Sequence, residues 1–266
     1  MKKTILITGA SSGFGLLLAT NLHKKGFEVI GTSREPQKHT GKVPFKLLAL
    51  DISDEYSIKS FAQELFSVTN KLDVLVNNAG YMLMGLAEET PVELGRKQFE
   101  TNFWGTVNLT NALLPYFRKQ NFGQIITVSS IVGLIGPPGL SYYSASKHAL
   151  EGYFKSLRFE LNQFNVKVSM VEPMWFKTGL GEHSDGATGS ISDYSVLRNK
   201  VNASAQKSMA EAPGPDAVVN TIEKLIGTKE PKMLNPVGKM SGMVLFLQNY
   251  APKMYEGSIL KSLQKA

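Results

Sequence analysis

The octapeptide Thr8-Gly9-Ala10-Ser11-Ser12-Gly13-Phe14-Gly15 stands between a short apolar run, residues 4–7, and a stretch with helical periodicity, residues 13–25. Glycines in such a loop let the backbone approach a pyrophosphate closely, and the helix that follows offers N–H groups and the positive end of its dipole. The spacing is G-x-x-x-G-x-G and not the commoner G-x-G-x-x-G. A glycine-rich turn without a ligand has a similar composition, so the loop favours a nucleotide site without establishing it.

Apolar runs rich in β-forming residues alternate with helical stretches along the first two thirds of the chain. The predicted strands are 4–7, 27–32, 45–50, 72–76, 124–128 and 166–171, and the predicted helices are 13–25, 54–68, 91–118 and 142–163. Short Val/Ile/Leu runs that are separated by helices are typical of a parallel sheet covered on both faces. The pattern predicts a single doubly wound α/β domain of the Rossmann type over residues 1–266, with about seven strands.

The regular alternation of predicted strands and helices ends after residue 171. Residues 179–195 are rich in Gly, Ser and Asp, and two predicted helices follow, at 196–210 and 216–226. We expect residues 179–212 to form a lid over the substrate, with an ordinary surface loop as the alternative. Residues 231–266 hold four of the ten methionines and five lysines against one glutamate. We expect this C-terminal helical extension to cover the substrate pocket or a subunit contact, with a membrane surface as the alternative.

The composition is that of an ordinary globular protein, with 266 residues, 42% hydrophobic and 19% charged, and a formal net charge of +7. The lysines are scattered, so we expect a solvated surface that steers an anionic cofactor, and no nucleic acid partner. The absence of cysteine excludes disulfides and thiolate catalysis, and the four histidines lack metal-ligand spacing, so we expect no metal. No apolar run approaches the ~20 residues of a membrane span, and none at the N-terminus suits a signal peptide. We therefore expect no membrane span and a cytoplasmic location.

Six residues fall at or just beyond the carboxyl ends of the predicted strands. They are Thr8, Thr32, Asp51, Asn77, Ser130 and Pro173. Open parallel sheets bind their ligands at this edge. The stretch Asn77-Asn78-Ala79-Gly80 would by itself be a polar turn, because Asn and Gly favour left-handed backbone. Its position at the ligand-binding edge makes it a second candidate segment for the site.

Tyr143 and Lys147 are spaced i, i+4 near the start of the predicted helix 142–163 and share one face of it. Pairs of this kind are common on helices and usually inert. However, Ser130 ends the preceding strand thirteen residues earlier, and Asn102 lies in the middle of a predicted helix, where asparagine is unfavourable. The four residues together are candidates for acid/base chemistry.

Over residues 3–178 the chain resembles the short-chain dehydrogenase/reductase family in the order and spacing of five motifs. They are Thr8-Gly-x-x-x-Gly13-x-Gly15, Asn77-Asn78-Ala79-Gly80, Asn102, Ser130 and Tyr143-x-x-x-Lys147. The chain is most similar to the NADP-dependent carbonyl, steroid and retinol reductases. One departure is Pro173-Met174, where the family has Pro-Gly, and it concerns the shape of the pocket near the nicotinamide. The resemblance implies an NADP(H)-binding oxidoreductase that forms dimers or tetramers.

The resemblance also implies a role for each matching residue. The implied catalytic residues are Asn102, Ser130, Tyr143 and Lys147. The implied cofactor-binding residues are Gly9, Ser11, Ser12, Gly13, Phe14, Gly15, Ser33, Arg34, Asp51, Ile52, Asn78, Ala79, Gly80, Tyr143, Lys147, Pro173 and Thr178. The expected substrate-binding residues are Met82, Met84, Ser130, Tyr143, Met174 and Trp175. The methionines and the tryptophan predict an apolar and adaptable pocket.

Hydride transfer to a carbonyl needs a proton donor at its oxygen, and we expect Tyr143 to be this acid/base. A free tyrosine has a pKa near ~10, which is too high for a base at neutral pH. One positive charge at ~5 Å favours the phenolate by about 3 kcal/mol at an effective dielectric of about 20, so Lys147 and oxidised nicotinamide are expected to bring the pKa of Tyr143 into working range. By resemblance, Ser130 holds the substrate oxygen, Lys147 binds the nicotinamide ribose, and Asn102 anchors a water that supplies protons.

The residues at the end of the second predicted strand indicate whether NAD(H) or NADP(H) binds. An acidic residue there binds the ribose 2′-hydroxyl of NAD(H), whereas an arginine binds the 2′-phosphate of NADP(H). Here the strand runs into Ser33-Arg34-Glu35. By family register Ser33 takes the place of the acidic residue, and Arg34 follows it. Glu35 is expected to face solvent. The segment therefore predicts NADP(H), with Arg34 as the phosphate ligand.

The predicted function is hydride transfer between NADP(H) and a hydrophobic ketone, aldehyde or secondary alcohol. A steroid or retinol dehydrogenase is the alternative within the same chemistry. A catalytically silent NADP-binding sensor is the alternative from another class, although such proteins usually lose one of the Ser, Tyr and Lys residues that are all present here. An epimerase or dehydratase with the same Tyr/Lys pair would usually need a longer chain.

Overall fold

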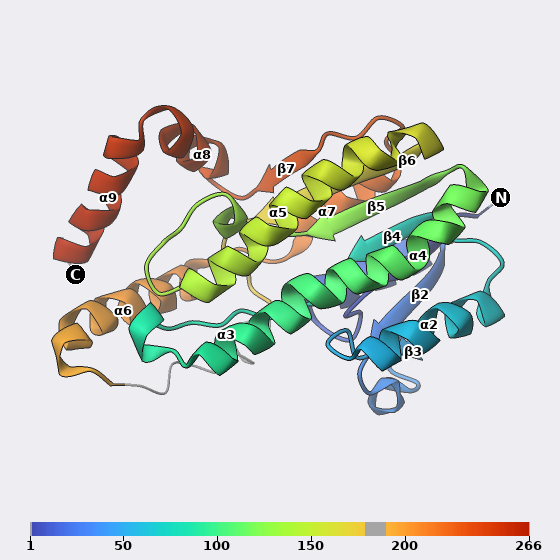
Figure 1. Cartoon of the computed structure of the whole chain (residues 1–266), viewed down its shortest axis with the longest axis horizontal. Helices are drawn as coiled ribbons and strands as arrows, with labels where there is room; N and C mark the ends of the chain where they lie inside the picture. The colour runs from blue at the N-terminus through green and yellow to red at the C-terminus, as the bar shows by residue number, and fades with distance from the viewer. Residues whose placement is uncertain (1, 179–189, 266) are drawn as a thin grey trace.

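A single sheet of parallel strands forms the centre of the molecule in the computed structural model, which describes residues 2–178 and 190–265 (Figure 1). Its seven strands run in the order β3-β2-β1-β4-β5-β6-β7. Their bounds are β1 Thr4–Ile7, β2 Glu28–Ser33, β3 Lys46–Ala49, β4 Val74–Asn77, β5 Gly123–Val128, β6 Val166–Pro173 and β7 Leu234–Val237. The order reverses between β1 and β4, which creates a crevice at the carboxyl ends of the strands. The predicted α/β fold is confirmed.

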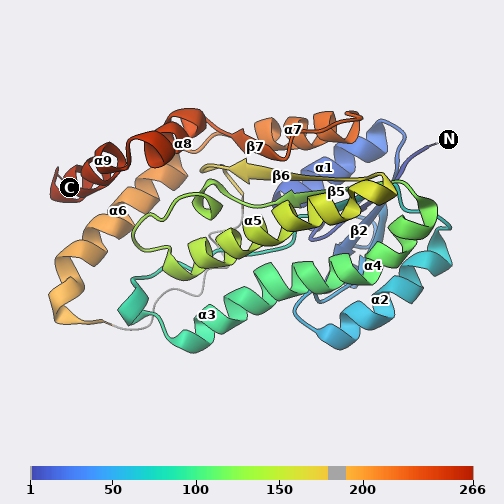
Figure 2. The ribbon, with the colours of Figure 1, turned by 45° about the horizontal axis from the view of Figure 1, so that its top comes forward.

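Helices cover both faces of the sheet. One face carries α1 (Gly13–Lys24) and α7 (Asp216–Ile226), and the other carries α2 (Glu55–Val68), α4 (Thr106–Gln120) and α5 (Ser141–Leu161) (Figure 2). The strands β1, β4 and β5 are buried along their whole length, which explains why their sequences are continuous apolar runs. Two apolar layers result, one on each side of the sheet.

The predicted helix 91–118 is interrupted in its middle. Residues Val92–Phe99 form α3, Glu100–Gly105 form a π-helical turn, and α4 follows without a break. At Gly105 a Cβ atom would lie 2.1 Å from the carbonyl oxygen of Ile52, so only glycine permits this close approach. Turns of this kind occur frequently at functional sites. Here the turn carries Asn102.

The seventh strand lies inside the stretch that the sequence assigned to a helical extension. β7 pairs with β6 at the edge of the sheet and contains Pro236, a residue that sheets tolerate at edges because it lacks an N–H group. The rest of the extension is α8 (Ser241–Tyr250) and α9 (Pro252–Lys265), which lie with α6 (Ser195–Glu211) at the end of the molecule away from the N-terminus (Figures 1 and 2).

Part of the predicted lid, residues 179–189, lies outside the described residues, and its remainder holds α6. Over 2–178 and 190–265, no helix combines the length and apolarity that a membrane crossing requires.

Candidate active site

The glycine-rich loop forms a cradle at the start of α1. Gly9 and Gly13 have φ angles of 65° and 53°, the left-handed region that favours glycine. A Cβ atom on Gly15 would lie 2.3 Å from the carbonyl oxygen of Gly9, so the third glycine lets the helix approach the loop. Ser12 stands at the N-cap of α1 without a side-chain hydrogen bond to the helix. The N–H groups of this helix end therefore remain suited to an anion.

The Asn77–Gly80 stretch is joined to this cradle by hydrogen bonds. The hydroxyl of Thr8 accepts hydrogen bonds from the backbone N–H groups of Asn78 and Ala79, both at 2.9 Å. The Asn78 amide donates in return to the carbonyl oxygens of Thr8, at 2.8 Å, and Gly9, at 3.2 Å. Asn77 is buried and donates to Thr110 and Thr127. The two motifs are thus one structural unit at the edge of the sheet.

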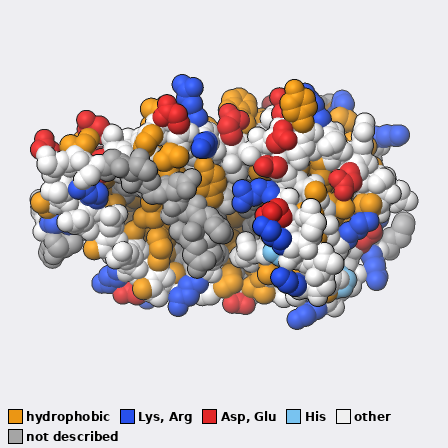
Figure 3. All heavy atoms as spheres, turned by 90° about the horizontal axis from the view of Figure 1, so that it is seen from below, with side chains coloured by type: hydrophobic (Ala, Val, Ile, Leu, Met, Phe, Trp, Pro, Cys, Tyr) orange, Lys and Arg blue, Asp and Glu red, His pale blue; other side chains and the backbone are white. Residues whose placement is uncertain are grey.

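A groove of about 1600 Å³ runs along this edge. This volume exceeds the roughly 300–1,000 Å³ of a typical small-ligand pocket, so a dinucleotide and a substrate fit side by side. The predicted residues that line the groove are Gly9, Ser11, Ser12, Gly13, Phe14, Ser33, Arg34, Asp51, Ile52, Asn78, Ala79, Gly80, Met82, Ser130, Tyr143, Lys147, Pro173, Met174, Trp175 and Thr178. Gly15, Met84 and Asn102 lie behind its wall. Figure 3 shows hydrophobic side chains gathered on one face of the molecule, with Lys and Arg side chains beside them.

Ser130, Tyr143 and Lys147 meet in this groove. The Ser130 hydroxyl lies within hydrogen-bond reach of the Tyr143 phenol and 3.3 Å from the carbonyl oxygen of Pro173. Lys147 Nζ donates to the carbonyl oxygen of Val128 at 3.0 Å and lies 5.8 Å from the centre of the Tyr143 ring. All three residues are at most 9% exposed. A buried proton donor beside a hydroxyl that can orient an oxygen is the arrangement that carbonyl chemistry needs.

Burial governs the protonation of Tyr143 and Lys147 in the protein by itself. Burial raises the pKa of Tyr143 to about 12, although the hydrogen bond with Ser130 lowers it. Burial lowers the pKa of Lys147 to about 8, and the nearby Glu151 carboxylate raises it. The expectation that Lys147 and oxidised nicotinamide together bring the pKa of Tyr143 into working range concerns the cofactor-bound enzyme and stays a prediction. In the protein by itself, desolvation of the phenolate dominates. Tyr143 is therefore a protonated phenol at neutral pH.

Asn102 is held firmly behind Gly80. Its Oδ1 accepts the backbone N–H of Tyr81 at 3.0 Å, and its Nδ2 donates to the Tyr81 carbonyl at 2.9 Å. A Cβ atom on Gly80 would lie 3.0 Å from Asn102 Oδ1 and 3.9 Å from Lys147 Nζ, so Gly80 stands between the two side chains. The structure thus brings Asn102 close to Lys147, and its role in proton supply stays a prediction.

Two buried carboxyl groups lie behind the catalytic wall, and sequence reasoning missed them. Glu151 is one turn beyond Lys147 on α5, and Glu172 immediately precedes Pro173; they are 3% and 0% exposed. Burial and the nearby charge of Glu151 raise the pKa of Glu172 to about 8, and burial also raises the pKa of Glu151. One carboxyl oxygen of Glu172 accepts the backbone N–H of Asn235 at 2.7 Å.

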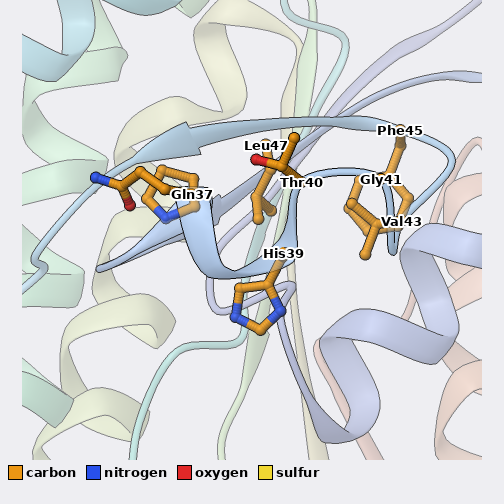
Figure 4. A pocket seen from close by; sticks show the side chains of 8 residues that line it. Gln37, His39, Thr40, Gly41, Val43, Phe45 and Leu47 are labelled. Carbon is orange, nitrogen blue, oxygen red and sulfur yellow. The ribbon is translucent and has the colours of Figure 1, made fainter.

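Arg34 lines the groove at the far end from Tyr143, just beyond β2. Glu35 is exposed to solvent, as expected, and also lines the groove; Lys38 pairs with it at 2.7 Å and lowers its pKa. The ion pair offsets the repulsion that Glu35 would exert on a phosphate. A shallow hollow of about 360 Å³ adjoins this end and includes His39, which also lines the groove (Figure 4).

An apolar cluster surrounds the Tyr143 end of the groove. Its buried members are Met82, Ile131, Val132, Ile135, Leu140, Tyr143 and Tyr255, and its partly buried members are Met84, Met174, Trp175, Met209, Val244, Leu245, Leu247 and Ile259. Met209, on α6, and the residues of α8 and α9 were not among the predicted site residues. Met209 falls in the predicted lid and the others in the C-terminal extension, which was expected to cover the pocket or a subunit contact, but no motif marked the individual residues.

Comparison with known proteins gives a consistent result. A model of the short chain dehydrogenase family matches residues 3–187. The chain is 40% identical to the uncharacterized oxidoreductase YusZ of Bacillus subtilis, over 98% of both chains. It is 38% identical to the 3-ketodihydrosphingosine reductase of Bacteroides thetaiotaomicron, over 92% of this chain and 91% of the relative.

A solved structure agrees with these relatives. A short-chain dehydrogenase from Streptomyces avermitilis superposes with a TM-score of 0.83 at 30% identity, with 98% of each chain covered. The sequence motifs, the sheet order and the geometry of the groove point to the same conclusion. The chain belongs to the short-chain dehydrogenase family and is an oxidoreductase of that family.

Proposed function

We propose that this protein is an NADP(H)-dependent reductase of bulky hydrophobic ketones. The observation that carries the proposal is the pairing of Ser130 with a protonated Tyr143 inside the apolar cluster. A phenol of high pKa is in the form that donates a proton during carbonyl reduction. The surrounding methionines and aromatic side chains favour a substrate that buries apolar surface.

The cradle and the Arg34 end of the groove fit a phosphorylated dinucleotide. The Gly15 position admits no side chain, and the start of α1 lacks a side-chain cap, which suits a pyrophosphate. Arg34 supplies a guanidinium that can bind a 2′-phosphate through two hydrogen bonds, and Ser33 and Ser11 line the same groove. The strand β2 ends at Ser33, where NAD(H)-binding proteins have an acidic residue, and the neighbouring Glu35 is paired with Lys38.

Each residue of the site has its own role in the proposed reduction of a carbonyl group. A bound nicotinamide supplies the hydride for the carbonyl carbon. The Ser130 hydroxyl donates a hydrogen bond to the carbonyl oxygen and holds it beside Tyr143 Oη. Tyr143 transfers its proton to that oxygen, and the charge of Lys147, held in place by the Val128 carbonyl, stabilises the phenolate that results. Asn102, close to Lys147 across Gly80, would anchor a water through which protons reach Lys147.

The relatives and the pocket support a narrower substrate class. The Bacteroides relative is named for reduction of 3-ketodihydrosphingosine, which is a long-chain ketone. The apolar cluster in this chain extends from Met82 to α8 and α9, farther than a small ketone requires. We infer that the substrate carries a long aliphatic chain next to its carbonyl group.

Purified protein is tested with NADPH or NADH against 3-ketodihydrosphingosine in detergent micelles, short ketones, a ketosteroid, retinal and a ketose sugar. Loss of the NADPH absorbance with the long-chain ketone, at a kcat/KM well above that of the short ketones and the sugar, supports the proposal. Preference for the steroid or retinal would favour a steroid or retinol dehydrogenase. Tight NADPH binding without turnover of any carbonyl would favour a silent sensor.

A further inference from the structure

Helix α8 is apolar on two opposite faces. Its sequence contains no charged residue, and Val244, Leu245 and Leu247 pack against the apolar cluster. On the opposite face, Met243, Phe246 and Tyr250 are 48%, 59% and 77% exposed. An apolar helix face is normally covered, and the described residues of this chain cover only one side of α8.

The exposed apolar side chains of the molecule gather around this helix. Twelve large hydrophobic residues are strongly exposed in the described chain, and half of them fall within residues 240–260. Besides the three on α8 they are Met240, Met254 and Leu260. Single exposed apolar residues are ordinary, whereas a contiguous group on one element marks an interaction surface.

Exposed lysines precede and follow α8 in the sequence. Lys239 precedes α8, and Lys253 and Lys261 lie on α9; all three are exposed and make no ion pair with any described residue. Glu256 is the one acidic residue between 231 and 266. An apolar helix face bordered by lysines is the pattern of helices that lie on lipid surfaces with anionic headgroups.

A second copy of the chain is a poorer occupant. A two-fold contact through α8 would bring the outer faces together and place Lys239 and Lys253 of both copies along one interface. Like charges opposed in this way weaken association. Anionic headgroups instead pair with the lysines, while the acyl region receives Met243 and Phe246, and a tyrosine such as Tyr250 suits the boundary between them.

We propose that the outer face of α8, Met243, Phe246 and Tyr250 bordered by Lys239, Lys253 and Lys261, docks this protein on an anionic lipid surface. The inner face of the same helix contributes to the cluster around Tyr143. Docking would therefore bring the substrate end of the groove to a membrane that dissolves long-chain ketones. This link to the substrate rests on the proposed function, whereas the docking itself does not.

The test is flotation of the whole protein, without cofactor or substrate, with vesicles of phosphatidylcholine alone or mixed with phosphatidylglycerol. We expect binding to the mixed vesicles that weakens with added salt. The double variant Met243→Asp/Phe246→Asp should lose at least ~10-fold in vesicle affinity, since each buried apolar side chain is worth about 1.5–3 kcal/mol and 1.4 kcal/mol is a factor of ten. Replacing Lys239, Lys253 and Lys261 with Gln should weaken binding to the mixed vesicles at low salt.

Phe159→Asp is the matched control, because Phe159 is 80% exposed on α5, away from this surface, and should float like the wild type. Thermal unfolding and turnover of a short soluble ketone verify that each variant is folded. Wild-type protein that fails to float with mixed vesicles overturns the docking, as does equal flotation of the double variant. A dimer that the double variant dissociates, without vesicle binding, assigns the surface to a second copy. Turnover of the long-chain ketone in micelles tests the proposed function separately.

Discussion

Lys147 Nζ lies 5.8 Å from the centre of the Tyr143 ring and is tied by a 3.0 Å hydrogen bond to the carbonyl oxygen of Val128. The ammonium group is thus held at the end of β5, near the phenol. It cannot turn toward solvent without breaking this hydrogen bond. Its position lets it stabilise the phenolate after proton transfer, while burial keeps the phenol protonated beforehand.

The reductive kcat/KM should fall as the pH rises through about 8. Burial lowers the pKa of Lys147 to about 8, so above that value the lysine loses the charge that stabilises the phenolate. Because kcat/KM reports ionisation in the free enzyme, the pH profile with NADPH and a saturable ketone measures this group directly. A profile that stays flat up to about pH 10 would show that Lys147 keeps its charge or is not needed.

Tyr143→Phe should lower turnover by at least ~10²–10⁴-fold, because it removes the proton and keeps the ring that fills the apolar cluster. The dissociation constant of NADPH, measured by fluorescence, should change little. Near wild-type turnover in this variant would refute the proposed mechanism. Loss of both folding and NADPH binding would instead show that the phenol is structural.

Arg34→Ala should raise the KM for NADPH by about 10- to 100-fold and leave that for NADH nearly unchanged. One hydrogen-bonded contact to a charged group is worth roughly 1.5–3 kcal/mol, which corresponds to this range. Arg96→Ala is the control, since Arg96 is an exposed arginine of α3 that does not line the groove. Equal use of both cofactors by the wild type would contradict the assignment of Arg34 as the phosphate ligand.

Glu172→Gln should stabilise the protein at alkaline pH. The pKa of Glu172 is raised from 4.5 to about 8, first by burial and then by the charge of Glu151. Between these values the unfolded chain is ionised and the folded chain is not, so the stability present below 4.5 is lost as the pH rises through about 8. Glutamine carries no charge and keeps an acceptor for the Asn235 N–H group.

Thermal unfolding followed by circular dichroism checks this expectation. Near pH 9 the gain should be on the order of a few kcal/mol, and near pH 5 it should be much smaller. The exposed Glu160→Gln on α5 should show no such dependence on pH. A Glu172→Gln variant that is less stable than wild type at pH 9 would mean that a bound cation or an unrecognised donor stabilises the carboxylate.

Gly15→Ala should weaken NADPH binding by more than ~10-fold and lower the unfolding temperature. The added Cβ atom would lie 2.3 Å from the Gly9 carbonyl oxygen and 2.6 Å from Asn78 Nδ2, so the cradle must shift. At Gly152 on α5 a Cβ atom meets nothing within 4 Å, and Gly152→Ala should be neutral or stabilising by up to about 1 kcal/mol. If both variants bind NADPH like the wild type, the close approach at Gly15 is not required.

Most of the sheet and the location of the site were predictable from the sequence. Buried parallel strands are largely apolar runs, and in this chain glycine and asparagine follow some of them at their carboxyl ends. Both features can be recognised in the sequence. Since these ends meet at one edge, Thr8, Asn77 and Ser130 could be assigned to one groove before their distances were known, and the family resemblance added Tyr143. The spacing of Tyr143 and Lys147 on one helix required only the helical repeat.

The last strand was not predictable in this way, and for the substrate wall the sequence indicated only the segments 179–212 and 231–266 and not the residues that reach it. β7 is a short edge strand with a proline, and only Val237 of its four residues is buried, so it lacks the apolar run that marks the other strands. Met209 and Tyr255 reach the apolar cluster from elements distant in sequence from the motifs. The periodicity of apolar residues along the sequence does not predict such long-range contacts.

The sequence by itself determined which chemical groups are present and on which strand ends they stand, because these follow from residue identity and from local repeats. Only the tertiary structure decided their protonation. Desolvation depends on every element packed around a group, and it raises the pKa of Tyr143 to about 12 where charge counting alone expected a fall. The same packing buries Glu172 next to Pro173 and leaves the outer face of α8 uncovered by the described residues.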